Sequence, residues 1–225
     1  CPSLGNMEVR ASYLDVAMVV EQIAKVCTLT ARVVVEGNMG GISAVMGYGT
    51  AQQKAFCAEH VLAGDKPAIC ITEPEAGSAA TEMQTTAHKQ GGKYILNGTK
   101  HWITGGGVSK LHLVFARVLD EAGSLQGIGG FILFADPTAE GVPKGFTVVG
   151  REHTMGLCGM PEAELRFDNI EIDEKWLIKP PSGLKHGFAD LMNAYNSQRV
   201  GAGTIALGVA AGALEHAKRY LLTRK

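Results

Sequence analysis

The spacing of apolar residues divides the chain into stretches of different period. Between residues 12 and 63, apolar side chains recur at the intervals of amphipathic helices. Ser12 with Asp15, and Thr50 with Gln53, have the spacing of capping boxes, in which two side chains close the first turn of a helix. We therefore expect helices that begin after Ser12 and after Thr50, and another that runs from Thr28 towards Gly37.

From residue 68 to about residue 178, short apolar runs alternate with Gly, Asn and Pro. Asn97-Gly98 is a strong hairpin signal, so residues 94–96 and 102–104 are expected to be partner strands, with Lys100 exposed to solvent between them. Further strands are expected at residues 111–118, 128–134, 146–149, 163–167 and 170–172. This spacing favours a β-sandwich or β-barrel.

From Leu184 to Lys225 the pattern is helical again and rich in Ala and Gly. Four glycines are spaced so that a second helix can approach closely: Gly201, Gly203, Gly208 and Gly212. The order of elements is thus α, then β, then α, which predicts an α+β fold. We expect three domains, at residues 1–67, 68–180 and 181–225.

Composition narrows the classes of protein that this chain can represent. It has 225 residues, of which 46% are hydrophobic and 19% charged, with a net charge of -1. These values fit a folded chain and give no electrostatic footprint for nucleic acid. We see neither an apolar run of about 20 residues that would span a bilayer nor a targeting segment. The five scattered cysteines indicate free thiols, and the histidines lack metal-ligand spacing.

Two motifs in the β region suggest a ligand site. Residues 69–78 read as a strand that ends in Thr72-Glu73-Pro74 and opens into a Gly-Ser turn, which exposes backbone N–H groups. Residues 97–104 bring Trp102 to the end of a strand, where an indole can pack against an aromatic cofactor. Taken separately, the first also fits an ordinary turn and the second a core tryptophan.

Together, Thr-Glu-Pro-x-Ala-Gly-Ser and Asn-Gly-x-Lys-x-Trp-Ile-Thr resemble the flavin-dependent acyl-CoA dehydrogenase family. The resemblance continues through residues 155–157, 167–170, 187–188, 198–199 and 224–225. It implies N-terminal helices, a central β-barrel or sandwich domain and the start of a C-terminal helical bundle. Family chains are usually longer at both ends, so the chain is expected to be truncated.

The resemblance also implies a set of site residues. The cofactor is FAD, and its expected contacts are Ile69, Ile71, Thr72, Trp102, Ile103, Thr104 and Arg224. The expected acyl-CoA contacts are Gly77, Ser78, Asn196 and Arg199. Because the family's arginine at the position of Arg224 usually reaches the flavin of a neighbouring subunit, the protein is expected to be a homo-oligomer, a tetramer or a dimer.

The implied reaction is α,β-dehydrogenation of an acyl-CoA thioester in fatty acid metabolism. A carboxylate removes the α-proton, the β-hydrogen leaves as hydride to FAD, and an electron-transferring flavoprotein accepts the electrons. The family occurs in bacterial cytoplasm and in the mitochondrial matrix, so either compartment is expected.

Two positions depart from the family pattern. Gln198 stands where a minority of members carry the catalytic glutamate, and an amide cannot act as a base at neutral pH. Cys158, expected to be a packing residue, stands where an arginine is usual. No catalytic base is assigned. The departures leave two alternatives open: other chemistry on an acyl-CoA, such as desulfination, oxygenation or reduction, and a non-catalytic truncated product. His101, beside Trp102, either tunes the flavin or is simply hydrogen-bonded.

Overall fold

The computed structural model describes residues 12–137 and 142–225, and the chain divides into two compact units. The helical unit has residues up to Val35 together with Ser197–Lys225, and the β unit is Glu36–Asn196. The three-domain division at residues 67 and 180 stays a prediction.

The helical unit contains α1 (Tyr13–Ala24), the start of α2 (Thr28–Met39) and nearly all of α6 (Asn196–Thr223). The side chain of Ser12 accepts a hydrogen bond from the Asp15 N–H, and the Asp15 carboxylate accepts one from the Ser12 N–H. This reciprocal cap satisfies two backbone donors that a helix end otherwise leaves free. The predicted starts of α1 and α2 are confirmed.

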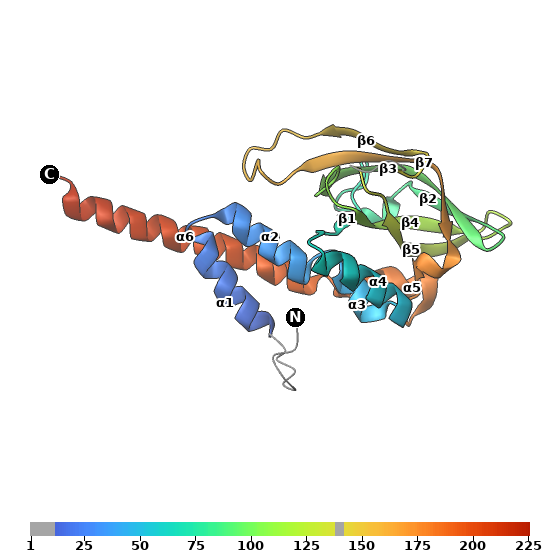
Figure 1. The fold of residues 1–225 in the computed structure, drawn as a ribbon, viewed down its shortest axis with the longest axis horizontal. Helices are drawn as coiled ribbons and strands as arrows, with labels where there is room; N and C mark the ends of the chain where they lie inside the picture. Colours follow the sequence, from blue (N-terminus) through green and yellow to red (C-terminus); the bar gives the residue numbers. More distant parts are fainter. Residues whose placement is uncertain (1–11, 138–141) are drawn as a thin grey trace. The chain divides into compact units, whose positions relative to one another are not determined.

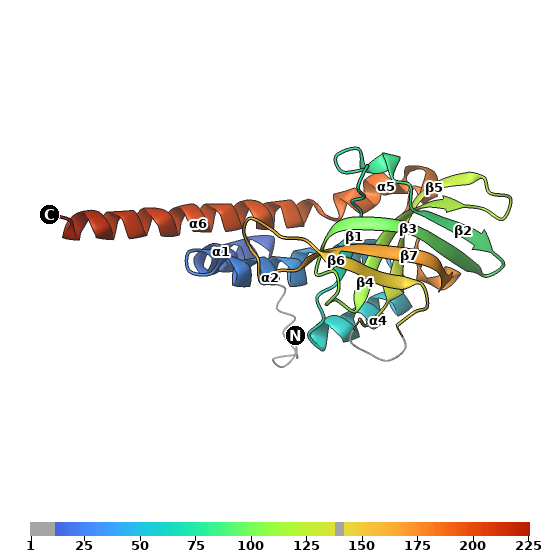
Figure 2. The same ribbon diagram turned by 90° about the horizontal axis from the view of Figure 1, so that it is seen from above.

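α6 and α1 lie side by side, as Figure 2 shows from above, and glycines of α6 allow this close approach. A Cβ atom added at Gly208 would lie 2.5 Å from the carbonyl oxygen of Glu21, and one at Gly212 would lie 2.6 Å from that of Lys25. An ion pair of 3.1 Å between Lys25 and Glu215 joins the same two helices. The predicted close approach is confirmed at Gly208 and Gly212, whereas a Cβ at Gly203 would meet nothing within 4 Å.

The helical pattern that runs from Leu184 to Lys225 forms two helices. α5 (Gly183–Asn193) ends before Tyr195, whose side chain is buried, and α6 begins at Asn196. By length and composition alone, the helical stretch Gly183–Thr223 could cross a membrane, because it contains an 18-residue window with a mean hydropathy of 1.2. One such stretch is weak evidence for a membrane span, because core helices pass the same test.

The β unit combines a mixed sheet with α5 and two further short helices. The two further helices are α3 (Ser43–Tyr48), which the sequence pattern did not predict, and α4 (Ala51–Leu62), capped by Thr50 and Gln53 as predicted. The strands are β1 (Ala68–Cys70), β2 (Thr86–Gln90), β3 (Lys93–Thr104), β4 (Leu111–Leu119), β5 (Leu125–Phe134), β6 (Phe146–Arg151), β7 (Glu162–Asp173) and β8 (Leu177–Ile178). Short 3-10 turns lie at Ala80–Glu82 and Glu174–Trp176.

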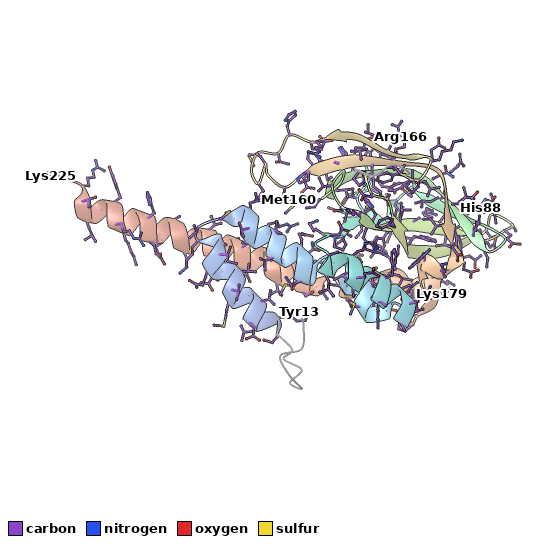
Figure 3. The ribbon with its side chains drawn as sticks, in the orientation of Figure 1. Tyr13, His88, Met160, Arg166, Lys179 and Lys225 are labelled. Carbon is purple, nitrogen blue, oxygen red and sulfur yellow. The ribbon has the colours of Figure 1, made fainter. Side chains whose placement is uncertain are left out.

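The sheet folds over on itself around one apolar core. Its strand order is β6-β7-β3-β2-β4-β5-β8, and β1 pairs with β4. Figure 1 shows β3, β6 and β7 above β4 and β5, and Figure 3 shows side chains filling the space between them. Alternate residues of β4 enter this core: Val114, Ala116 and Val118. The intervening ones, Leu111, Leu113 and Phe115, share a second core with residues of α3, α4 and α5. The expected α+β class with a central sandwich is confirmed.

The hairpin expected at Asn97-Gly98 is wrong. β3 runs unbroken through both residues, and its turn with β2 is at Gly91 and Gly92. Gly98 instead marks a bulge against β7, where it adopts φ 151° and packs directly on Thr85. Glycine is favoured there because a side chain would collide with Thr85. The runs 163–167 and 170–172 likewise belong to one strand, β7.

The solvent-exposed position expected for Lys100 is also wrong, because its side chain is 0% exposed. The Lys100 Nζ donates to Glu73 Oε1 at 2.7 Å and to the carbonyl oxygen of Ile71 at 2.9 Å. The Glu73 carboxylate also accepts the N–H groups of Gln84 at 2.6 Å and Thr85 at 3.0 Å. One buried ion pair therefore joins β3 to the segment after β1 and to the segment before β2.

The environment of each partner acts on its pKa in two directions. Burial acts to raise the pKa of Glu73, but hydrogen bonds from Lys100, Thr85 and Gln84 outweigh it and lower that pKa from 4.5. Burial lowers the pKa of Lys100, and the Glu73 carboxylate opposes that shift. The carboxylate of Glu73 is thus held in its charged form by its three donors.

We expect Lys100→Met to destabilise the protein by roughly 3–5 kcal/mol, because it leaves the buried Glu73 carboxylate without its cation. Lys93→Met is the matched control: it removes a lysine from the same strand whose partner, Glu171, is exposed. The control should change stability little. Urea unfolding measures both. Equal effects of the two substitutions would contradict the account.

The lowered pKa of Glu73 also predicts how stability depends on pH. A carboxyl group whose pKa is lower in the folded state stabilises the fold above its unfolded value near 4.5, and this stabilisation is lost as the pH falls through the folded value. The wild-type protein should therefore lose more stability on acidification than Glu73→Gln does. Urea unfolding at a series of acidic pH values tests this, and parallel curves would refute it.

Candidate functional site

The two segments predicted to hold the cofactor lie side by side in the β unit. Ile69 is on β1, Ile71 and Thr72 follow it directly, and residues 102–104 end β3. The N–H of His101 donates to the carbonyl oxygen of Thr72 at 2.9 Å. Since Lys100 also binds the carbonyl oxygen of Ile71, consecutive residues of β3 hold consecutive residues of the other segment.

Trp102 occupies a bulge that turns its indole out of the sheet. The pairing of β3 with β7 shifts register between Lys100 and Ile103, and Trp102 takes φ 56°. Left-handed backbone is unfavourable for a bulky residue and marks a conformation that its surroundings impose. The Trp102 side chain is 50% exposed, whereas Ile103 is 1% exposed. The bulge therefore offers an aromatic face to solvent and keeps its neighbour in the core.

Polar contacts from β6 and β7 support the same strand end. Glu162 begins β7, and its two carboxylate oxygens accept the hydroxyl of Thr104 at 2.8 and 2.9 Å. His101 Nε2 lies 2.8 Å from Glu152 Oε1, just after β6. Glu164 adds a second carboxylate, since the ligand atoms of His101, Glu152 and Glu164 lie within 4.8 Å of one another. His101 and Thr104, which flank Trp102 and Ile103, are thus both hydrogen-bonded to acidic residues.

The predicted acyl-CoA contacts Gly77 and Ser78 lie in an exposed bend after β1. The bend follows a turn closed by two backbone hydrogen bonds between Glu73 and Ala76, of 3.1 and 3.2 Å. Because Glu73 is held in the buried ion pair, the start of this turn, next to Thr72, is fixed in place.

The remaining predicted contacts lie outside the sheet. Asn196 opens α6 at the boundary of the two units, Arg199 is on α6, and Arg224 follows its end. Gln198, at the position discussed for a catalytic base, is half-buried on the same helix. The ligand roles of these residues stay predictions, as do those of the residues on β1 and β3.

The packing role expected for Cys158 is wrong. The Cys158 side chain is exposed, and its thiol donates to the carbonyl oxygen of Thr154 at 3.2 Å. The loop leaves Met155 exposed too, and only Met160 at its end is buried. The four described cysteines, Cys27, Cys57, Cys70 and Cys158, are free thiols, and Cys1 lies outside the described residues.

The side chains at this strand end fit a flavin. An isoalloxazine ring is flat and aromatic, with hydrogen-bonding groups along one edge, so it needs an aromatic surface beside polar groups. The half-exposed indole of Trp102 supplies the surface, and the half-buried Thr72 and Thr104 supply hydroxyl and backbone groups beside it.

Sequence reasoning missed the residues that support this site, to different degrees. Lys100 could have been found: with β3 taken as one strand, the inward series Tyr94, Leu96, Gly98 continues to Lys100. The assumed turn at Gly98 hid that alternation. Glu152 and Glu162 carry no comparable signal, because they reach β3 only through sheet pairing.

Comparison with known proteins agrees with the fold. The family described as acyl-CoA dehydrogenase, middle domain, matches residues 68–170. A 3-sulfinopropanoyl-CoA desulfinase of Variovorax paradoxus is 55% identical over 95% of this chain and 53% of its own length. An acyl-CoA dehydrogenase of Bacillus subtilis is 33% identical over 95% of this chain and 54% of its own.

Comparison with solved structures also finds acyl-CoA dehydrogenases of the same fold. A glutaryl-CoA dehydrogenase of Mycobacterium smegmatis in complex with FADH2 is 25% identical, with a TM-score of 0.82 over 96% of this chain and 52% of that one. The chain thus spans about half the length of the proteins that it matches. Motifs, sheet topology and relatives agree, and the chain belongs to the acyl-CoA dehydrogenase family.

Proposed function

We propose that the protein is a flavin-dependent enzyme that removes the sulfinate group from an acyl-CoA thioester such as 3-sulfinopropanoyl-CoA. The observation that carries this proposal is the difference in identity: 55% to a desulfinase against 33% to a dehydrogenase, over the same share of the chain. Two departures from the dehydrogenase pattern agree with it, the amide at Gln198 and the exposed thiol at Cys158.

The proposed reaction balances without an external oxidant. The bond between the β-carbon and sulfur breaks, its electron pair stays on carbon, and the carbon takes up a proton. Sulfur leaves as sulfur dioxide, which water converts to sulfite. Carbon is reduced and sulfur is oxidised within one molecule, so no electrons remain to be handed to an acceptor.

The β unit contributes binding and orientation to this reaction. Trp102, Thr72 and Thr104 would hold the FAD, which would supply a flat aromatic surface for binding the substrate. The exposed bend at Gly77 and Ser78 receives the thioester arm. The bulge at Trp102 and the ion pair behind Thr72 keep these groups in one geometry, which supplies the proximity that catalysis needs.

Dehydrogenation is the second candidate, and membership of the family favours it. That reaction removes two electrons and two protons from the substrate, so it reduces the flavin and needs an electron-transferring flavoprotein or another acceptor. It also needs a base, and the described residues do not identify one. The fate of the flavin therefore separates the two candidates.

The decisive experiment mixes the FAD-loaded full-length protein anaerobically with 3-sulfinopropanoyl-CoA, and separately with propanoyl-CoA and butanoyl-CoA. Desulfination predicts one sulfite released for each thioester converted to propanoyl-CoA, while the flavin absorbance stays that of the oxidised form. Bleaching of the flavin by butanoyl-CoA, with no sulfite released from 3-sulfinopropanoyl-CoA, would establish the dehydrogenase. No turnover of any thioester would contradict both.

A substitution at Trp102 tests the flavin site separately from turnover. Trp102→Gly should weaken FAD binding by about tenfold, because it removes the aromatic face. The free energy of unfolding should change by only about 1 kcal/mol or less, since glycine accepts φ 56° without strain.

The matched control is Asn169→Gly, which relieves a left-handed residue at φ 52° on β7. It should leave FAD affinity unchanged. Flavin fluorescence titration and urea unfolding measure the two quantities. If Trp102→Gly binds FAD as tightly as the control does, Trp102 is not a flavin contact.

A further inference from the structure

Two neighbouring residues of β3 stack on each other where a regular strand would separate them. In a regular strand, successive side chains point to opposite faces of the sheet. The ring centroids of His101 and Trp102 are nevertheless 5.1 Å apart, with an interplanar angle of 21°. The left-handed backbone of Trp102 makes this possible, because it brings the indole back to the side of its neighbour.

One hydrogen bond holds the imidazole of His101, and another holds its backbone. Its Nε2 lies 2.8 Å from Glu152 Oε1, and both side chains are partly buried, at 22% and 29% exposed. A carboxylate only accepts hydrogen bonds, so Nε2 carries the hydrogen. The backbone N–H of His101 donates to Thr72, which fixes the strand on which the ring stands.

Glu152 is tied to the strand that already supports the site. Its N–H donates to the carbonyl oxygen of Glu162 at 2.8 Å, and the carboxylate of Glu162 accepts the Thr104 hydroxyl. The contacts thus run from Trp102 through His101, Glu152 and Glu162 to Thr104, which lies on the same strand as Trp102. Residues far apart in sequence hold one indole.

We infer that His101 and Glu152 are positioning residues that fix the plane of the Trp102 indole where it meets the flavin. We call His101 and Glu152 the clamp. The clamp is a property of this chain, while its use towards FAD rests on the proposed function. An indole that is 50% exposed and unsupported would sample several rotamers, and a ligand would have to order it on binding. With the clamp in place, that ordering is complete before the flavin arrives.

The clamp can be tested in the full-length protein labelled with 5-fluorotryptophan. Loss of one ¹⁹F signal in Trp102→Phe assigns the resonance of Trp102. In the FAD-free protein, Glu152→Ala and His101→Phe should each move and narrow that resonance, because the indole becomes mobile. His101→Phe retains a ring but cannot bind Glu152, so the double variant should resemble His101→Phe alone.

The control is His153→Ala, an exposed histidine next to Glu152, which should leave the resonance in place. In the FAD-loaded protein, the two clamp variants should raise the dissociation constant of FAD by about fivefold, the usual effect of one lost hydrogen bond. They should also weaken the visible circular dichroism of the flavin. Melting temperatures confirm that every variant is folded.

The two readouts separate this inference from the proposed function. An unchanged Trp102 resonance in both clamp variants would overturn the inference, whatever the enzyme does. A protein that binds no FAD would refute the proposed function, while the resonance of the FAD-free protein would still decide whether the clamp exists.

Discussion

The buried ion pair between Lys100 and Glu73 is the contact on which the candidate site depends. Burying two charges is costly unless their hydrogen-bonding groups are satisfied, and here a carbonyl oxygen and two N–H groups complete the pair. Its partners come from three segments of the chain. Because it joins β3 to the residues after β1, it sets the position of Thr72 relative to Trp102.

One residue with strained backbone lies at the same place. Trp102 is a bulky residue with left-handed backbone among the predicted flavin contacts, and its half-exposed ring gains little from burial there. Such a conformation persists only when the surroundings hold it. The ion pair on one side and the His101–Glu152 contact on the other provide that support. The strained residue is therefore understandable as part of a preformed binding surface.

Interactions between residues close in sequence could be predicted, whereas interactions between distant segments could not. Capping boxes at Ser12 and Thr50 act over three residues, so the helix starts were predictable. The Asn97-Gly98 signal is equally local, but pairing along the whole of β3 overrides it and converts the turn into a bulge. The support from Glu152 depends on sheet pairing between distant segments, and a single sequence does not reveal it.

For function, the sequence likewise predicts the family but not the reaction. The paired motifs identified the family, and both lie within the residues that match its middle domain. They do not encode the reaction, which depends on residues that meet the substrate. Gln198 and Cys158 indicated a departure without naming its chemistry. Identity to a desulfinase supports the alternative over dehydrogenation, which the motifs alone had favoured.

The central claim is that an ion pair and a bulge preform one surface for a flavin. A crystal structure of the full-length protein with FAD tests it most directly. The account predicts the isoalloxazine ring against the Trp102 indole, with Thr72 and Thr104 at its polar edge and the pair of Lys100 and Glu73 intact. Flavin bound elsewhere, or Trp102 turned back into the sheet with ordinary strand geometry, would contradict it.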